Sequence, residues 1–366
     1  MLLERDIDWL RYTITMSFRA WMSIATLVLV AVVLYFARVE LYHAWTLLGQ
    51  VNIWILALLL PMQLFTYYCA GEMTFSYLRA KRAIDHVSPW EQTKIALEMN
   101  FVNHVMPSGG VSGISYTSWR LSKLGISAGK ATMAQLVRYA MQFSAFIILL
   151  AIAVLMVTID GNVSRWVILM SSSLVSLMLG TILGGIYLFS SQSRMNKTSV
   201  WLVKVVNPFI RRVTFGKVLN LIKQESADEF MEDIHNDYLE LKRDRKVLFK
   251  PLGWGLLFTA VDAMMFYVVF LALGEVINPA PILIAYGVAV FTSMIVVTPG
   301  GTGAFEVVMA AFLAFAGVAN SAAIAGIVLT RVIVLIGTIG FGYIFYQQAI
   351  VKHGKGKSES DTSTQR

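Results

Sequence analysis

Long apolar runs recur along the chain and are separated by short polar segments. They lie at 21–37, 51–71, 131–158, 166–190, 251–274, 282–298, 303–317 and 322–347. Several of them exceed the ~20 residues that an α-helix needs to cross about 30 Å of hydrocarbon, whereas 282–298 and 303–317 are short for that purpose. The pattern predicts an all-α polytopic membrane protein with about six full spans.

Two proline-glycine motifs interrupt this pattern, MPSGGVSG at 106–113 and TPGGTGAFE at 298–306. Proline removes a backbone donor and paired glycines raise the entropic cost of a helix, so each motif should break one. Broken helix at membrane depth is tolerated only inside protein or along a polar cavity, and two corresponding breaks indicate a transporter-type site. The residues expected at the breaks are Pro107, Gly109, Gly110, Pro299, Gly300, Gly301 and Gly303.

The composition agrees with a membrane location. Hydrophobic residues make up 57% of the 366 residues and the mean hydropathy is +0.66, which is too apolar for a soluble core. The first run is not a cleaved signal, because VVLYFARVEL offers no small-residue cleavage site and further spans follow. Cys69 is the single cysteine and lies in the second span, so neither a disulfide nor a cysteine metal site is expected.

The distribution of basic residues sets the orientation. We place the N-terminus inside and four short segments outside: 38–50, 159–165, 275–281 and 318–321. The inside segments then hold 26 of the 30 Lys and Arg residues and the outside segments hold 2, a strong positive-inside signal that places both termini in the cytoplasm. The net charge of +8 therefore describes a basic face apposed to anionic inner-leaflet lipids, and no nucleic-acid partner is needed to explain it.

In this topology the two interrupted stretches form hairpins of opposite orientation. The stretch from about 89 to 119 begins and ends inside, whereas 282–317 begins and ends outside. Full crossings would give the same parity, but the short helices favour re-entrant hairpins. Span, hairpin and span then occur twice, at about 51–158 and about 251–347, as an inverted repeat. The transmembrane domain as a whole is expected at 21–350, between a cytoplasmic segment, 1–20, and a disordered tail, 351–366.

Ionisable residues within the spans follow the same repeat. Glu72 lies 37 positions before the first glycine pair and Arg138 lies 29 after it. Asp262 lies 38 before the second glycine pair and Arg331 lies 31 after it. Each half therefore contains an acid, a glycine break and an arginine at nearly equal spacing.

Two interpretations of these arginines stay open. A charge near the bilayer centre costs about 2.5–3.5 kcal/mol on insertion scales, so it faces the bundle interior or a wet cavity and finds a partner. In the first interpretation, Arg331 and Arg138 only pair with Glu306 and Asp262 and lock helices together. In the second, each guanidinium presents a bidentate fork to a lipid phosphate, which displaces a carboxylate. No catalytic residue, metal ligand or cofactor site is predicted.

The first hairpin is more polar than lipid would permit, so its interior should be protein or water. Asn103 and His104 lie just before its break and are candidate headgroup contacts, with a proton relay as the less favoured role of His104. Arg120 is expected at the inner membrane interface, where it could also touch a headgroup. Backbone amides freed at the break attract anions without any side chain.

The longest inner segment is 191–250. Six apolar residues recur in it at helical spacing and predict an amphipathic helix or helix pair over 217–246: Leu219, Ile222, Phe230, Ile234, Tyr238 and Leu241. The basic ends of this element would lie at lipid headgroups, the alternative being a solvated linker without specific binding.

The motifs NHVMPSGG, WRL, TPGGTGAFE and LTRVIVLIGTIGFGYIFY together resemble the transmembrane, flippase-like region of lysylphosphatidylglycerol synthases and its stand-alone relatives. The resemblance covers about residues 20–350. The first motif departs from the family's usual Pro-Gly-x-x-Gly, and Arg120 comes later than the family's arginine. The resemblance implies a bacterial inner-membrane protein that moves a phospholipid or isoprenoid-linked lipid between leaflets, without the soluble aminoacyl-transferase domain.

The expected function is lipid translocation without ATP hydrolysis, since the chain has no Walker-type loop. Its partner would be a membrane lipid, with a separate lipid-modifying enzyme as a further candidate. One alternative is a membrane transferase of lipid metabolism, which would need a carboxylate base at the membrane edge and a metal. Another is a membrane scaffold that presents the amphipathic segment to such an enzyme.

Overall fold

The computed structural model describes residues 28–32, 34–35, 38–84, 87–106, 111–159, 165–213, 223–295 and 303–353. Within these residues every regular element is helical, which confirms the all-α fold. The elements are Arg38–Leu47 (α3), Leu48–Gln50 (η1), Ile53–Leu56 (α4), Leu59–Ala80 (α5), Pro89–Val105 (α6), Val111–Ser122 (α7), Ala128–Ile159 (α8), Arg165–Phe189 (α9), Gln192–Val213 (α10), Gln224–Arg243 (α11), Arg245–Leu248 (η2), Phe249–Ala272 (α12), Pro279–Ile295 (α13), Ala304–Phe315 (α14) and Asn320–His353 (α15).

Five stretches of the described chain are long and apolar enough to cross a membrane. They are Ile53–Ala80, Ala128–Ile159, Ile168–Phe189, Arg245–Ala272 and Asn320–His353. Each coincides with one of the six expected spans. The remaining span, 21–37, lies mostly outside the described residues, so the total of six stays a prediction. The chain is a multi-pass membrane protein.

Two pairs of shorter helices occupy the expected hairpin positions. The first pair, α6 and α7, has 17 and 12 residues, and the second, α13 and α14, has 17 and 12 as well. At 1.5 Å per residue these helices are about 25 and 18 Å long, less than the hydrocarbon thickness, which agrees with re-entrant hairpins.

Most of the break residues lie outside the described part of the chain, namely Pro107, Gly109, Gly110, Pro299, Gly300 and Gly301. Gly303 is described, and it has φ +91° at the N-cap of α14. This left-handed conformation favours glycine, because a Cβ would be strained there. The second motif therefore needs a glycine at this position to start the helix.

The described helices repeat in length, which agrees with the inverted repeat. α5 to α8 have 22, 17, 12 and 32 residues, and α12 to α15 have 24, 17, 12 and 34. Glu72 is the fourteenth residue of α5 and Asp262 is the fourteenth of α12. Arg138 is the eleventh residue of α8 and Arg331 is the twelfth of α15. The acid and the arginine thus occupy matching places in both halves.

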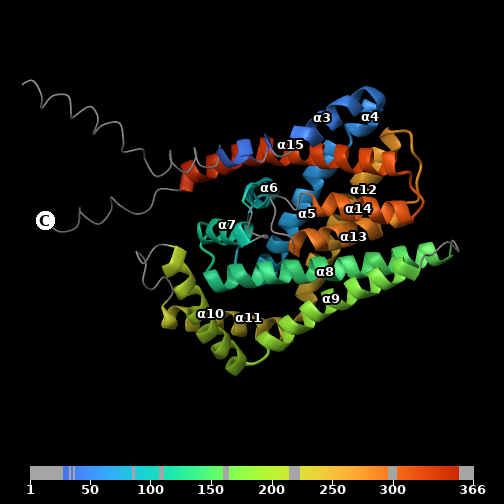
Figure 1. The fold of residues 1–366 in the computed structure, drawn as a ribbon. Coiled ribbons are helices and arrows are strands. Elements are labelled where there is room, and N and C mark those ends of the chain that lie inside the picture. The colour runs from blue at the N-terminus through green and yellow to red at the C-terminus, as the bar shows by residue number, and fades with distance from the viewer. Residues whose placement is uncertain are drawn as a thin grey trace, which may run out of the picture.

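Helix packing follows the same symmetry. α5 packs against α12 at the centre of the molecule, α6 packs against α15, and α13 packs against α8. Figure 1 shows α6 and α7 toward the end of the molecule that carries α10 and α11, and α13 and α14 toward the opposite end. The hairpins therefore enter the bundle from opposite sides, and each packs against the long helix of the other half.

Small residues on α15 permit close helix contacts. A Cβ added at Gly326 would lie 2.6 Å from the Phe270 ring, and one at Gly337 would lie 2.4 Å from Gln63 Oε1. Gln63 is buried and donates from Nε2 to the Val334 carbonyl of α15 at 2.8 Å. In lipid the hydrophobic effect does not drive helices together, so close packing and buried hydrogen bonds of this kind hold the bundle.

The amphipathic element predicted at 217–246 is present as α11, with 214–222 outside the described residues. Its apolar face is buried, with Ile234 3% exposed, in a cluster that includes Leu78 of α5 and Ala134 of α8. His235 Nδ1 lies 2.7 Å from the Phe189 carbonyl oxygen at the end of α9. The element is thus docked on the membrane helices, and the alternative of a solvated linker is wrong.

Candidate functional site

The ion pair expected between Arg331 and Glu306 is present. Arg331 Nε donates to Glu306 Oε1 at 2.9 Å, and the two side chains are 24% and 21% exposed. The other carboxylate oxygen, Oε2, accepts from the Gly303 amide at 2.6 Å, where α14 begins. A carboxylate in the first turn also complements the helix dipole. Glu306 therefore joins the second break to the middle of α15.

Arg331 is surrounded by further candidate residues. Its guanidinium carbon lies 4.6 Å from the centre of the Phe305 ring, a favourable cation–π arrangement. Its positive charge also acts on Asp262 of α12 and on His104 at the end of α6. The contacts of Arg331 with Glu306 and Phe305 thus lie within the second half, and its charge reaches His104 of the first hairpin.

Asp262 does not form the ion pair with Arg138 that the first interpretation proposed. It accepts a short hydrogen bond from the hydroxyl of Tyr286 on α13, and both groups belong to the second half of the chain. The sequence analysis missed Tyr286, because a lone tyrosine in an apolar helix carries no signal for a partner in another helix. Glu72, the matching acid of the first half, pairs with Arg79 at 2.5 Å, two turns along α5.

Arg138 is a buried cation without a carboxylate partner in the described parts of the chain. The residue is 6% exposed. One guanidinium nitrogen lies 2.8 Å from Met99 Sδ, the guanidinium carbon lies 5.1 Å from the centre of the Tyr139 ring, and Nε has no hydrogen-bond partner. A guanidinium carries five donors suited to oxygen, so a thioether and a ring leave most of its capacity unused.

The sequence explains why Arg138 lacks the carboxylate partner that Arg331 has in Glu306. Glu306 is the third residue of α14, and Gly113 is the third residue of α7. The Gly113 amide donates to Asn103 Oδ1 at 2.9 Å, and a Cβ there would lie 2.3 Å from the same oxygen. Asn103 therefore closes the first hairpin across its break, in the space where a side chain at residue 113 would lie. The two halves therefore match in their arginines and in Glu72 and Asp262, but only the second half has a glutamate at the third position of its second hairpin helix.

The expectation that Arg120 touches a headgroup at the interface requires correction. Arg120 is 2% exposed, its Nε donates to Glu98 at 2.7 Å and its Nη2 donates to Glu91 at 2.6 Å. Tyr116 also donates to Glu98, at 2.8 Å. Arg120 therefore fastens α7 to α6 and is not free for a lipid. The sequence did contain a signal for this contact, because Glu91 and Glu98 lie seven residues apart and therefore on one face of the α6 helix.

The arrangement defines a class of protein: a multi-pass helical membrane protein with two short-helix hairpins and buried or half-buried charged side chains in both halves. The chain belongs to the lysylphosphatidylglycerol synthase TM region family, which it matches over residues 22–342. It is also 22% identical to a UPF0104 membrane protein of Methanothermobacter thermautotrophicus over 233 residues, 63% of this chain and 67% of that protein. No solved structure matches the chain.

Proposed function

We propose that this protein is a lipid translocase, which moves an anionic phospholipid or an isoprenoid-phosphate-linked lipid between leaflets without ATP hydrolysis. The observation that carries the proposal is the unequal state of two arginines at matching positions of the repeats. Arg331 is neutralised by Glu306, whereas Arg138 is buried and forms no ion pair with a carboxylate among the described residues. Because a buried, uncompensated cation is costly, an anion that reaches Arg138 would be bound favourably.

The guanidinium group selects the class of substrate. Its planar fork matches two oxygens of a phosphate, and charge-assisted bonds of this kind are among the strongest in proteins. Arg138 offers the fork directly, whereas Arg331 offers it only when a phosphate displaces Glu306. Glu306 keeps a second partner in the Gly303 amide, so it stays anchored to α14 after it releases the arginine. In this proposal the phosphate visits the two arginines in turn.

The orientation is part of the proposal. The positive-inside bias supports cytoplasmic termini in the cell membrane, with α11 on the inner side. In a Cys69→Ser background, a cysteine in place of Trp45 should be labelled by an impermeant reagent added to intact cells, and one in place of Glu225 should be protected. Labelling of position 225 from outside would reverse the orientation.

The function is tested with purified protein in liposomes that contain fluorescent phosphatidylglycerol. Leaflet exchange is measured by dithionite quenching without nucleotide, and protein-free liposomes give the background. We expect Arg138→Gln to slow exchange about tenfold or more, the equivalent of one charge-assisted hydrogen bond. Arg194→Gln is the matched control, because Arg194 is half-buried at the junction of α9 and α10, where it donates to the Tyr187 carbonyl and the Ser190 hydroxyl. Wild-type exchange at background level would refute the function, and unchanged exchange in Arg138→Gln would refute the site.

A further inference from the structure

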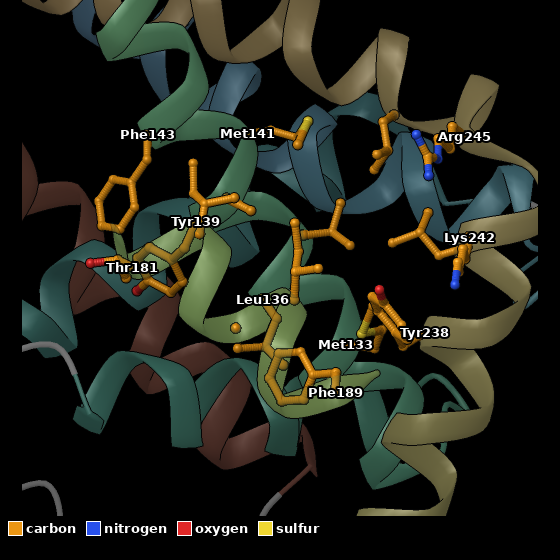
Figure 2. Close-up of a pocket in the computed structure, with 17 residues that line it drawn as sticks. Met133, Leu136, Tyr139, Met141, Phe143, Thr181, Phe189, Tyr238, Lys242 and Arg245 are labelled. Carbon is orange, nitrogen blue, oxygen red and sulfur yellow. The ribbon is translucent and has the colours of Figure 1, made fainter. Parts of the chain in front are cut away.

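An apolar pocket of about 440 Å³ lies on the other side of α8 from the packed hairpins, between α8, α9 and α11 (Figure 2). This volume falls in the range of about 300–1,000 Å³ that is typical of small-ligand sites. Its walls are side chains of the two membrane helices, among them Leu136, Phe143, Ile182 and Ile186. Arg138, Arg331, Glu306 and Asp262 do not line it, and of the residues described at the candidate functional site it includes Tyr139, which contacts Arg138.

One end of this pocket is basic. Lys242 at the end of α11 and Arg245 in η2 line it, and both residues are exposed. Figure 2 shows them together at one end, with Phe143 and Thr181 at the other. Among the described residues, neither Lys242 nor Arg245 forms an ion pair. The pocket therefore joins apolar walls to two cations that form no ion pair within the described part of the chain.

The position in the membrane selects the occupant. α8 and α9 are membrane spans, and α11 is an amphipathic helix docked on their ends, so the pocket lies where acyl chains meet headgroups. An acyl chain fits the apolar walls, and an anionic headgroup at the same level complements Lys242 and Arg245. A soluble peptide would have to displace lipid from α9, whose outer face is largely exposed.

We propose that this pocket is a binding site for one anionic phospholipid of the leaflet on the α11 side, with an acyl chain between α8 and α9 and the phosphate at Lys242 and Arg245. The site goes beyond the proposed translocation, since it does not include Arg138 or Arg331. It is coupled to the transport residues through Tyr139, which lines the pocket and also carries the Arg138 guanidinium on its ring.

Native mass spectrometry of the purified, delipidated protein tests the proposal, with dioleoyl phosphatidylglycerol, dioleoyl phosphatidylcholine and oleate added separately. We expect one tightly retained phosphatidylglycerol, with weaker binding of phosphatidylcholine and oleate. Lys242→Ala with Arg245→Ala should weaken phosphatidylglycerol binding about 25-fold, at about fivefold per charge near the surface. The matched control is Arg243→Ala with Lys246→Ala, which removes two charges of the same segment that do not line the pocket.

A second pair of variants tests the apolar part. Gly185 lines the pocket, and a Cβ there would meet only the Phe189 ring edge, at 3.6 Å, so Gly185→Leu should fold and fill the space. Gly184→Leu is its control, because a Cβ at Gly184 meets nothing within 4 Å and the residue does not line the pocket. Equal phosphatidylglycerol binding by both leucine variants would overturn the proposal. So would equal weakening by both charge-removing pairs, or oleate binding as tight as that of phosphatidylglycerol. Failure of the liposome exchange assay would leave these results unaffected.

Discussion

The ion pair between Arg331 and Glu306 can be dissected by a double-mutant cycle. Breaking a fully buried pair by removing one partner costs about 3–5 kcal/mol, whereas an exposed pair contributes about 0.2–1 kcal/mol. With side chains 24% and 21% exposed, this pair lies between those limits. We therefore expect Arg331→Ala to cost about 2 kcal/mol, most of it from the carboxylate that is left behind.

Removal of the acid has a second effect that must be separated from the first. Glu306→Ala also removes the bond to the Gly303 amide, and the loss of a helix cap costs about 1 kcal/mol. Glu306→Gln keeps a carbonyl oxygen for that amide and removes only the charge. The coupling energy between Arg331→Ala and Glu306→Gln should then be about 2 kcal/mol, which double-mutant analysis resolves.

The assay combines unfolding titrations of the four proteins in one detergent with leaflet exchange in liposomes. The double variant should recover most of the stability lost in Arg331→Ala, because no uncompensated charge remains, yet it should not transport lipid. Exchange at the wild-type rate in the double variant would show that the pair is purely structural and that the substrate site lies elsewhere. A coupling energy near zero would refute the energetic argument.

Three further predictions concern the hairpin and the docked helix. Arg120→Gln leaves Glu98 buried without a full charge partner and should lower stability by about 3–5 kcal/mol, whereas Arg120→Gln with Glu98→Gln should recover part of it in the same titration. Gly129→Ala places a Cβ 2.6 Å from the Asp233 Cβ and should loosen α11 from α8, which hydrogen exchange of α11 would report. Burial raises the pKa of Asp237, so its ionisation opposes docking: stability should fall as the pH rises from 3.8 through the raised pKa, and Asp237→Asn should remove that dependence.

The sequence was sufficient for the elements whose signal is local. Apolar runs of membrane length predicted about six spans, five of which are found in the described residues, because a helix in lipid satisfies its own backbone and needs only enough apolar residues. The pair of Arg331 and Glu306 was also predictable, because two isolated charges at membrane depth must find each other. In both cases the competing arrangement has a high free energy in lipid: an unsatisfied backbone group in the first case and an unpaired charge in the second.

Contacts set by packing between distant helices were beyond the sequence. Arg120 followed a tryptophan near an expected interface, which suggested exposure, yet the hairpin turns it onto two acids of α6. Arg138 looked equivalent to Arg331 by spacing, yet Gly113 stands where the other half has a glutamate. The identity of a partner depends on which side chain occupies the facing position, and spacing from a glycine pair does not contain that information.

The crossed packing of the hairpins restricts how the molecule can move. The hairpin helix α6 of the first half packs on α15 of the second, and α13 of the second half packs on α8 of the first. Each half therefore contacts the other through its hairpin. A rigid-body rotation of one half against the other would have to break both the α6–α15 and the α13–α8 contacts at the same time. The proposed lipid translocation would therefore have to proceed with both contacts in place. A disulfide between α5 and α12 should accordingly leave lipid exchange intact, whereas one that ties α14 to α15 should stop it.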